Sequence, residues 1–187
     1  PGDRSLSSVY ASPLAAGGRS DVIFDINNQS DKPGYGYQLK MGATSLTEAW
    51  DARRSSSHNH FMLGQINEWF YHDLAGIACD AAAGPGFKAI VIKPQPVGDV
   101  KWASASFASL RGLIACDWKR REGRFTLNVT VPANAEATVW LPSRAVDTVS
   151  ESGQPVAAAR GVRVLRQEGD RTVFEVASGK YRFESRW

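Results

Sequence analysis

The spacing of the apolar residues changes once along this chain, at residues 81–86, and that change limits the folds that the chain can adopt. Upstream, apolar residues recur at intervals of three and four, as on one face of an amphipathic helix. Downstream, they alternate with polar residues, as in strands that bury one face. The stretch between, Ala-Ala-Ala-Gly-Pro-Gly, has the composition of a linker. We therefore predict an α+β chain with a helical domain over 1–80 and a β-domain over 81–187.

The helical domain is predicted to hold several short helices and one longer one. Residues 1–20 are rich in Ser, Gly, Ala and Pro and are expected to form a loop, with Ser20 or Asp21 capping the next helix. The longer helix is predicted to begin near Asn59 and to end with Gly76 near its C-terminus. Its apolar face comprises Leu63, Ile66, Phe70, Leu74 and Ile77. These faces exceed what a few short helices can cover mutually, so we expect the helices to belong to a larger α-domain.

The β-domain is predicted to be an antiparallel sandwich of short strands. The clearest hairpin has Glu122-Gly123 at its turn, between strands at 112–119 and 124–131. Further strands are expected at 87–92, 138–141, 162–166, 172–176 and 181–183.

Composition narrows the classes of function. The net charge is only +3, and the Lys119-Arg120-Arg121 cluster beside the hairpin turn indicates a solvated turn rather than a nucleic-acid patch. No apolar run reaches about 18 residues, so no membrane-spanning helix is expected. Cys79 and Cys116 are interpreted as buried small hydrophobes, with a disulfide left open. Because the chain starts with Pro1 rather than Met, we expect an upstream part to be missing, and targeting stays open between cytoplasm and periplasm.

Polar groups with chemical potential cluster between residues 45 and 60. Ser45-Leu46-Thr47-Glu48 fits the capping box of a helix, which local sequence favours over a catalytic role for Glu48. A carboxylate can also serve as a general base, provided that an acid faces it. His58 and His60 form an H-x-H pair without further ligands at a suitable spacing, so a hydrogen bond from either to a hydroxyl group is favoured over metal binding. Asn59 is a candidate helix cap.

Several stretches, in one order, resemble a known enzyme family. They are GRSDV (18–22), PGYGYQLKMGATSLTEAWD (33–51), SHNHFMLGQINEWFYHDLAGI (57–77) and PGFKAIVIKPQP (85–96). Together they resemble the α-L-rhamnosidases, inverting glycoside hydrolases in which a six-hairpin α/α barrel precedes a C-terminal β-sandwich. The resemblance implies the last helices of that barrel followed by the terminal sandwich, and it implies neither a metal nor another cofactor.

The resemblance also implies roles for individual residues. Glu48 matches the carboxylate that acts as general base, and His60 matches a histidine that contacts rhamnose. Trp50 is predicted to bind substrate as well, with a place in the core or groove lining as its alternative. The family's general acid belongs to an upstream motif that this chain lacks. The chain departs from the family pattern at Thr47, usually a large aromatic, and at Ala49, usually Arg.

Three functions are therefore weighed. The first is the C-terminal part of an enzyme that hydrolyses terminal α-L-rhamnosyl residues with inversion, with a rhamnose-containing glycoside or polysaccharide and the rest of the barrel as partners. The second is a non-catalytic carbohydrate-binding or structural module that lacks the acid half of the site. The third is an unrelated structural β-sandwich. None of them requires nucleic acid or a membrane.

Overall fold

A computed structural model describes residues 11–187, and the chain divides between Phe70 and Tyr71 into two compact units. None of the helices in the described range has the length and apolar character needed to cross a membrane.

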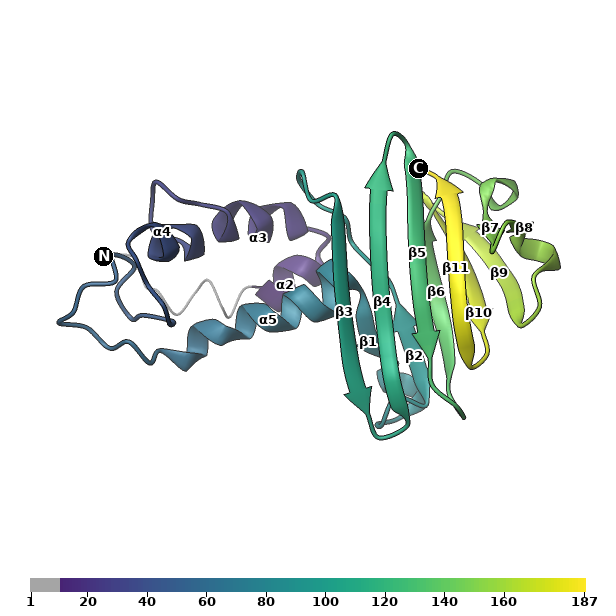
Figure 1. Ribbon diagram of the computed structural model, residues 1–187, viewed down its shortest axis with the longest axis horizontal. Coiled ribbons are helices and arrows are strands. Elements are labelled where there is room, and N and C mark those ends of the chain that lie inside the picture. The colour runs from purple at the N-terminus through teal and green to yellow at the C-terminus, as the bar shows by residue number, and fades with distance from the viewer. Residues whose placement is uncertain (1–10) are drawn as a thin grey trace. The chain divides into compact units, whose positions relative to one another are not determined.

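The first unit is helical. Its helices are α2 (Ala11–Ala16), α3 (Ser20–Asn27) and α4 (Tyr35–Lys40), followed by irregular chain up to residue 60 (Figure 1). Helix α2 occupies part of the range that was predicted to be a loop, and the first ten residues of that range lie outside the described residues.

The predicted cap of α3 is wrong. Arg19 holds the N-cap position, and no side chain caps the helix. Ser20 is the first residue inside the helix, and its buried hydroxyl accepts a hydrogen bond from the indole Nε1 of Trp69 at 3.1 Å. Asp21 instead pairs with Arg19 at 2.9 Å. The hydroxyl that could cap the helix is thus used for a contact 49 residues away in sequence.

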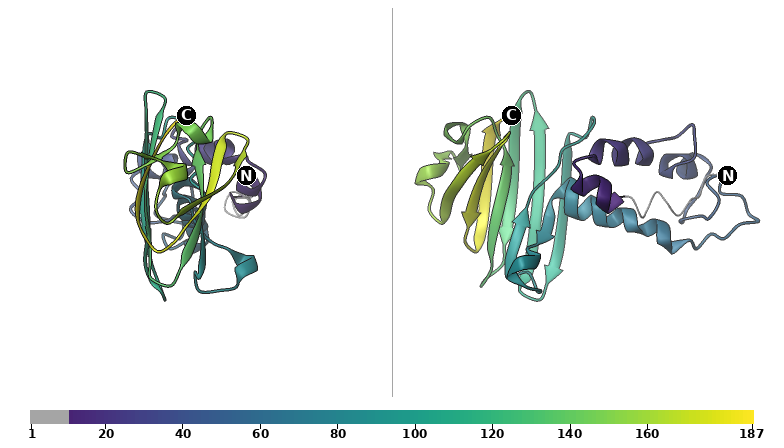
Figure 2. Two further views of the ribbon diagram at one scale, coloured as in Figure 1. Left: turned by 90° about the vertical axis from the view of Figure 1, so that its right-hand side faces the viewer. Right: turned by 180° about the vertical axis from the view of Figure 1, so that it is seen from behind.

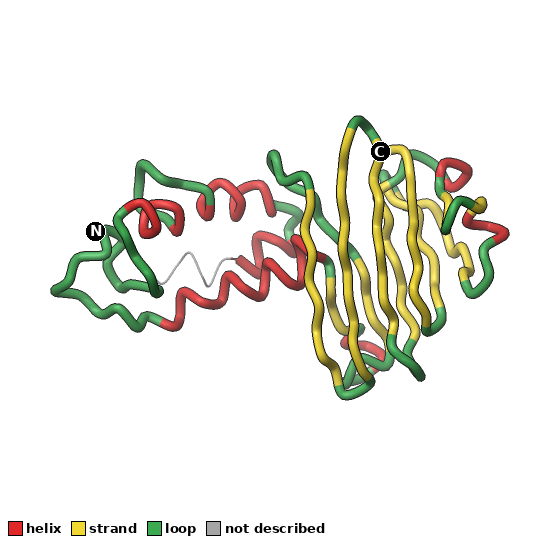
Figure 3. The backbone as a smooth tube through the Cα atoms, in the orientation of Figure 1, coloured by secondary structure: helices red, strands yellow, loops and turns green. Residues whose placement is uncertain are grey.

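The winding of the longer helical stretch widens along its length, from a 3₁₀ helix through an α-helix to a π-helix. It consists of the 3₁₀ helix η1 (Phe61–Gln65), helix α5 (Ile66–Trp69) and the π-helix η2 (Phe70–Ala75) (Figure 3). Leu63, Ile66 and Trp69 are all buried. The stretch ends at Gly76, whose φ of 87° is left-handed, as predicted for a helix terminus.

Gly76 cannot be replaced without moving the backbone. A Cβ atom there would stand 2.2 Å from the backbone nitrogen of Pro94. Ile77, predicted on the helix, instead begins strand β1 (Ile77–Cys79) and pairs with Ile92. The helical spacing of Ile77 was coincidental, because the chain turns at Gly76 before reaching it.

The second unit is a sandwich of two sheets, which the turned view separates (Figure 2). One sheet has the order β1-β2-β6-β10-β9 and the other the order β3-β4-β5-β11-β7-β8. The remaining strands are β2 (Ala89–Ile92), β3 (Trp102–Ser109), β4 (Gly112–Arg121), β5 (Arg124–Val131), β6 (Glu136–Pro142), β7 (Ser150–Glu151), β8 (Gln154–Pro155), β9 (Val162–Glu168), β10 (Arg171–Val176) and β11 (Gly179–Arg186).

The predicted α+β class and sandwich are confirmed, with one exception in strand direction. Strands β2 and β6 pair in parallel, whereas all the other described strand pairs are antiparallel. The β4–β5 hairpin turns at Glu122 and Gly123, with φ of 52° and 73°, the left-handed pair that a two-residue hairpin turn needs. Strands β1, β3, β7 and β8 were not predicted.

The core lies between the two sheets and includes aromatic side chains with fixed polar partners. Trp118 is fully buried, and its indole Nε1 donates to the carbonyl of Leu74 at 2.8 Å. Cys116, also fully buried, lies 2.9 Å from the carbonyl of Ala75, and burial raises the pKa of its thiol. Cys79 is half-buried. Both cysteines are free thiols, so the disulfide that sequence left open is absent.

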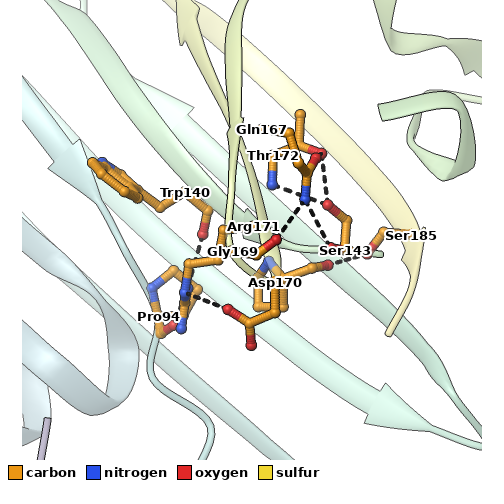
Figure 4. A network of polar contacts seen from close by, with 10 residues as sticks. Pro94, Trp140, Ser143, Gln167, Gly169, Asp170, Arg171, Thr172 and Ser185 are labelled. Carbon is orange, nitrogen blue, oxygen red and sulfur yellow. Dashed lines mark hydrogen bonds and ion pairs between the residues drawn. The ribbon is translucent and has the colours of Figure 1, made fainter. Parts of the chain in front are cut away.

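A polar network closes the end of the sandwich near the β9–β10 turn (Figure 4). The hydroxyls of Ser143 and Thr172 lie 2.6 Å apart, and both residues are fully buried. Arg171 donates to the carbonyls of Pro94 and Trp140 at 2.9 and 3.1 Å, and burial lowers the pKa of its guanidinium. Each buried polar group named here has a partner, which is the condition for keeping such groups in a core.

Candidate active site

Glu48 and His60 lie on two irregular segments that are hydrogen-bonded to each other. The backbone N–H of Glu48 donates to the carbonyl of Ser57 at 2.8 Å, and that of His60 donates to the carbonyl of Leu46 at 2.9 Å. The Ser45 hydroxyl adds a bond of 2.6 Å to the carbonyl of His58. The segments around Glu48 and His60 are therefore neighbours in space, although twelve residues separate the two positions.

The capping box predicted at residues 45–48 is wrong, because no helix begins there. Ser45 uses its hydroxyl as a donor to the opposite segment, whereas a cap would accept from a helix N–H. The Glu48 side chain is exposed, and its Oε2 accepts a long hydrogen bond of 3.4 Å from the backbone N–H of Ser57. This geometry contradicts a helix-capping role for Glu48, and its carboxylate is exposed to solvent.

Buried neighbours on either side hold Glu48 outward. Thr47 and Ala49 are 0% and 1% exposed, so the chain alternates inward, outward and inward through Glu48. The Thr47 hydroxyl donates to the carbonyl of Ala49 at 2.7 Å. The amide of Gln38, a buried residue of α4, donates to the carbonyl of Thr47 at 2.7 Å. Small residues at 47 and 49 therefore suit this closely packed loop.

Sequence reasoning missed the supporting roles of Gln38 and Ser57. Gln38 gave no usable signal in the sequence, because this polar residue is buried while its apolar neighbour Leu39 is 73% exposed. Ser57 contributes backbone groups, which have no signature in the sequence.

Trp50 is half-buried beside the same loop. Its ring meets that of Tyr35 edge to face, with centroids 5.6 Å apart and planes at 84°. The Tyr35 hydroxyl donates to the carbonyl of Leu63 at 2.8 Å, and burial raises the pKa of Tyr35 to about 12. Trp50 is thus fixed by packing on one side while part of its surface stays open. A hollow of about 340 Å³ lies nearby, lined by Tyr35, Gln38, Leu39, Ala43, Thr44, Ser45 and Leu46.

The two histidines of the H-x-H pair differ in their contacts. His58 Nε2 lies 3.2 Å from the carbonyl of Arg53. His60, rather than the predicted Asn59, occupies the cap position of η1, without a side-chain cap bond, and is half-buried. Within residues 11–187, no group of three or more His, Cys, Asp or Glu side chains is placed to hold a metal ion.

Two of the aspartates upstream of the loop are poor candidates for the opposing general acid. Asp21 pairs with Arg19 at 2.9 Å and Asp31 with Lys40 at 2.8 Å, and all four side chains are exposed. These hydrogen bonds lower the pKa of both carboxyl groups. A general acid must keep its proton near neutral pH, so a lowered pKa is the wrong direction for that role.

The two parts of the chain match two adjoining domain families. Residues 7–74 match the bacterial α-L-rhamnosidase 6 hairpin glycosidase domain, and residues 76–155 match the bacterial α-L-rhamnosidase C-terminal domain. The fold and the loop thus define the end of a glycoside hydrolase barrel followed by its terminal β-domain.

Known proteins carry both parts in the same order. The α-L-rhamnosidase of Streptomyces avermitilis is 36% identical over 175 residues, which cover 89% of this chain and 16% of that enzyme. The crystal structure of the S. avermitilis enzyme in complex with L-rhamnose aligns with a TM-score of 0.83 at 33% identity, over 96% of this chain and 17% of that one. The enzyme of Dictyoglomus thermophilum aligns with a TM-score of 0.82 at 30% identity, over 98% and 21%.

These matches confirm the family predicted from sequence. The chain belongs to the α-L-rhamnosidase family, and it corresponds to a C-terminal part of its longer members. It spans 16–19% of the length of the curated relatives that it matches.

Proposed function

We propose that this chain contributes the general-base side of an α-L-rhamnosidase site, with Glu48 as the base. The observation that supports this most is the exposed carboxylate of Glu48, held outward between buried neighbours on a loop of the glycosidase-domain match. The proposed substrates are terminal α-L-rhamnosyl residues of glycosides or polysaccharides. The complex of the S. avermitilis relative with L-rhamnose supports that substrate class.

In the proposed reaction, Glu48 takes a proton from a water molecule as the water attacks the anomeric carbon. The glycosidic bond breaks on the opposite face of the sugar, and a second carboxylic acid protonates the departing oxygen. Such a pair stands roughly 6.5–9.5 Å apart in inverting enzymes, which leaves room for the water and yields the inverted sugar. We assign the acid to the remainder of the barrel, outside this chain.

His60 and Trp50 are proposed to bind the sugar. His60 lies on the segment bonded to that of Glu48, where an imidazole nitrogen can exchange a hydrogen bond with a sugar hydroxyl. The open part of the Trp50 indole can pack on the C–H face of the sugar ring, because the face of an aromatic π-system is negative and attracts C–H groups. Residues 1–80 would thus act in catalysis, and 81–187 would form the terminal domain.

The test replaces Glu48 by Gln in the longer enzyme that carries this chain. Loss of a general base is expected to lower kcat on an aryl α-L-rhamnoside at least about 10²-fold. The matched control is Glu68→Gln, an exposed carboxylate on α5, which should keep the parent rate. A Glu48→Gln enzyme with near-parental kcat would remove the assignment.

A second variant separates a base from a positioning group. In Glu48→Ala, added azide is expected to restore turnover, because azide attacks the anomeric carbon without a proton to give up. NMR of the product should show the inverted configuration. Retained configuration in the parent reaction would contradict the inverting mechanism, whatever the rates.

A further inference from the structure

Two adjoining hollows lie on the sandwich, and no residue of the loop that bears Glu48 is among those that line them. They measure about 690 and 510 Å³ and share Lys119, Arg121, Glu122 and Arg124 at the β4–β5 turn. Trp102 and Trp187 also line the larger hollow, and Thr126 lines the smaller one. These volumes lie in the range typical of small-ligand sites, about 300–1,000 Å³.

Strand register gathers the key side chains on one face of the sheet. Trp102 of β3 pairs with Lys119 of β4, which pairs in turn with Thr126 of β5. Residues directly opposite each other on neighbouring strands project to the same face. Trp118 and Phe125, which project from the other face, are fully buried in the core. The row Trp102–Lys119–Thr126 therefore points outward.

Trp102 is the notable member of this row, because the residue is 62% exposed. Tryptophan is usually well buried, and an exposed ring beside a hollow keeps a large flat surface available to a ligand. Its cross-strand neighbour Lys119 places an ammonium group at the edge of that surface.

The charges around the larger hollow are mainly positive, with five basic and two acidic side chains. Arg120 serves the fold: its Nε donates to the carbonyl of Val100 at 2.6 Å, and its guanidinium lies over the Trp187 ring at 5.3 Å. Within the described part of the chain, Lys101 and Lys119 have no ion-pair partner. Both lysines are exposed and available to an anion.

The remaining groups suit a hydroxylated ligand. The Thr126 hydroxyl can donate and accept, and the exposed carboxylate of Glu122 can accept hydrogen bonds from hydroxyl groups. Arg121 pairs with Glu122 at 3.0 Å, and Arg124 pairs with Glu184 at 3.1 Å. Carboxylates placed among the cations can accept hydrogen bonds from sugar hydroxyls.

We propose that this outward face, with Trp102, Lys119 and Thr126 as its binding groups and Lys101 in the lining of the larger hollow, is a second site that binds acidic saccharides. The Trp102 ring packs on the C–H face of a sugar, and the lysines bind the carboxylate of a uronic acid. The site shares no residue with the proposed hydrolytic site, and the proposal does not depend on the role of Glu48. Its function is to hold the enzyme on an anionic polysaccharide.

The experiment measures binding of the 187-residue chain to polygalacturonate by affinity electrophoresis and calorimetry. We expect Trp102→Ala to weaken binding about tenfold, the scale of one lost aromatic contact, and Trp102→Tyr to restore most of it. Lys119→Gln should weaken binding severalfold, and added salt should weaken it further through screening. The matched control is Lys180→Gln, an exposed lysine on β11 of the same sheet, which should leave the affinity unchanged.

Two further probes separate an acidic saccharide from other ligands. Fully methyl-esterified polygalacturonate keeps the sugar rings without the charge, and duplex DNA keeps the charge without the pyranose rings. Both should bind at least about tenfold more weakly, a difference of ~1.4 kcal/mol.

The proposal is overturned by equal binding of all three polymers, by absence of binding, or by affinities unchanged in both Trp102→Ala and Lys119→Gln. It is also overturned if the longer enzyme does not bind, since another domain then covers Trp102. Catalytic rates of the Glu48 variants bear on none of these outcomes.

Discussion

The side chains next to Glu48 explain how an irregular loop can hold one carboxylate outward. Buried Thr47 and Ala49 fix the backbone on both sides of Glu48. The amide of Gln38, on helix α4, donates a hydrogen bond to the carbonyl of Thr47. Side chains locked by packing and hydrogen bonds are what a functional group needs for a fixed position. Such support comes here from buried residues.

Tyr35 provides a pH test of this support. Burial raises its pKa from 10 to about 12, so the folded chain binds the phenolic proton more tightly than the unfolded chain does. Its contribution is complete below pH 10 and is lost as the pH rises toward 12. Above pH 10, the unfolding free energy of Tyr35→Phe should therefore fall less steeply than that of the parent chain.

Denaturant unfolding of the chain at pH 7 to 11.5 measures this effect. At neutral pH the variant should be less stable by about 1 kcal/mol, because the bond to the Leu63 carbonyl is lost. Tyr71→Phe, at an exposed tyrosine, serves as the control and should follow the parent curve. Parallel curves for the parent and Tyr35→Phe would contradict the prediction.

At this scale, two local geometries predicted from sequence are wrong, and the roles of Glu48, His60 and Trp50 stay predictions. The S-x-x-E pattern at 45–48 indicates a cap because it is judged on neighbours alone. The actual partner of Ser45 is the carbonyl of His58, thirteen positions away, and no local rule can find it. Ser20 fails as a cap for the same reason, since its partner is Trp69.

Among the elements, strands with strong local signals were predicted and those without them were not. Strand β5 alternates clearly, and its hairpin has a Glu-Gly turn. Strand β3 reads Trp-Ala-Ser-Ala-Ser-Phe-Ala-Ser, and its small residues favour no particular structure. The parallel pairing of β2 with β6 joins segments separated by more than forty residues, so it follows from the whole sandwich.

The buried network at the β9–β10 turn leads to a stability prediction. Ser143 accepts from the backbone N–H of Thr172 at 3.0 Å and bonds its hydroxyl at 2.6 Å. Ser143→Ala would leave the backbone N–H of Thr172 buried without this acceptor, although the Thr172 hydroxyl keeps its bond to Gln167 at 2.9 Å. The substitution should cost about 1–3 kcal/mol of unfolding free energy.

Thermal or urea unfolding of the purified chain measures that loss. Ser104→Ala, at an exposed serine of edge strand β3, is the control and should stay within about 0.5 kcal/mol of the parent. Equal stabilities for Ser143→Ala and Ser104→Ala would show that the network contributes nothing.

For the whole molecule, the ordered motifs predicted the family, while the extent of the match shows how much of the enzyme is represented. The chain covers about a fifth or less of each relative described above. Apolar side chains of the helical unit are correspondingly exposed, with Phe61 at 79% and Leu39 at 73%. We assign these residues to contacts with the rest of the barrel.

This assignment predicts how the 187-residue chain behaves alone. It should self-associate as its concentration rises, because exposed apolar patches associate in water. Replacing Phe61 and Leu39 together by Ser should favour the monomer, whereas Leu110→Ser, at a 98% exposed residue on the sandwich, should not. Light scattering with size-exclusion chromatography measures the mass, and a parent chain that stays monomeric would contradict the prediction.

The same chain should bind rhamnosides without hydrolysing them, because one carboxylate cannot both activate water and protonate the leaving group. Calorimetry with an aryl rhamnoside and a turnover assay on the same sample test this. Clear turnover by the chain alone would mean that both groups are present in it.

The place of β11 in its sheet has a consequence for biosynthesis. Last in the chain order of strands, it nevertheless lies inside the sheet, paired along its whole length with β5 and also with β7. A ribosome therefore synthesises the other strands of this sheet before β11, which joins β3-β4-β5 to β7-β8, has left the exit tunnel. Until then β5 presents an open backbone edge, to which a strand of another nascent chain can pair. Molecules that lose Gly179–Arg186 through stalling or proteolysis would keep that edge permanently and become the seeds of aggregation.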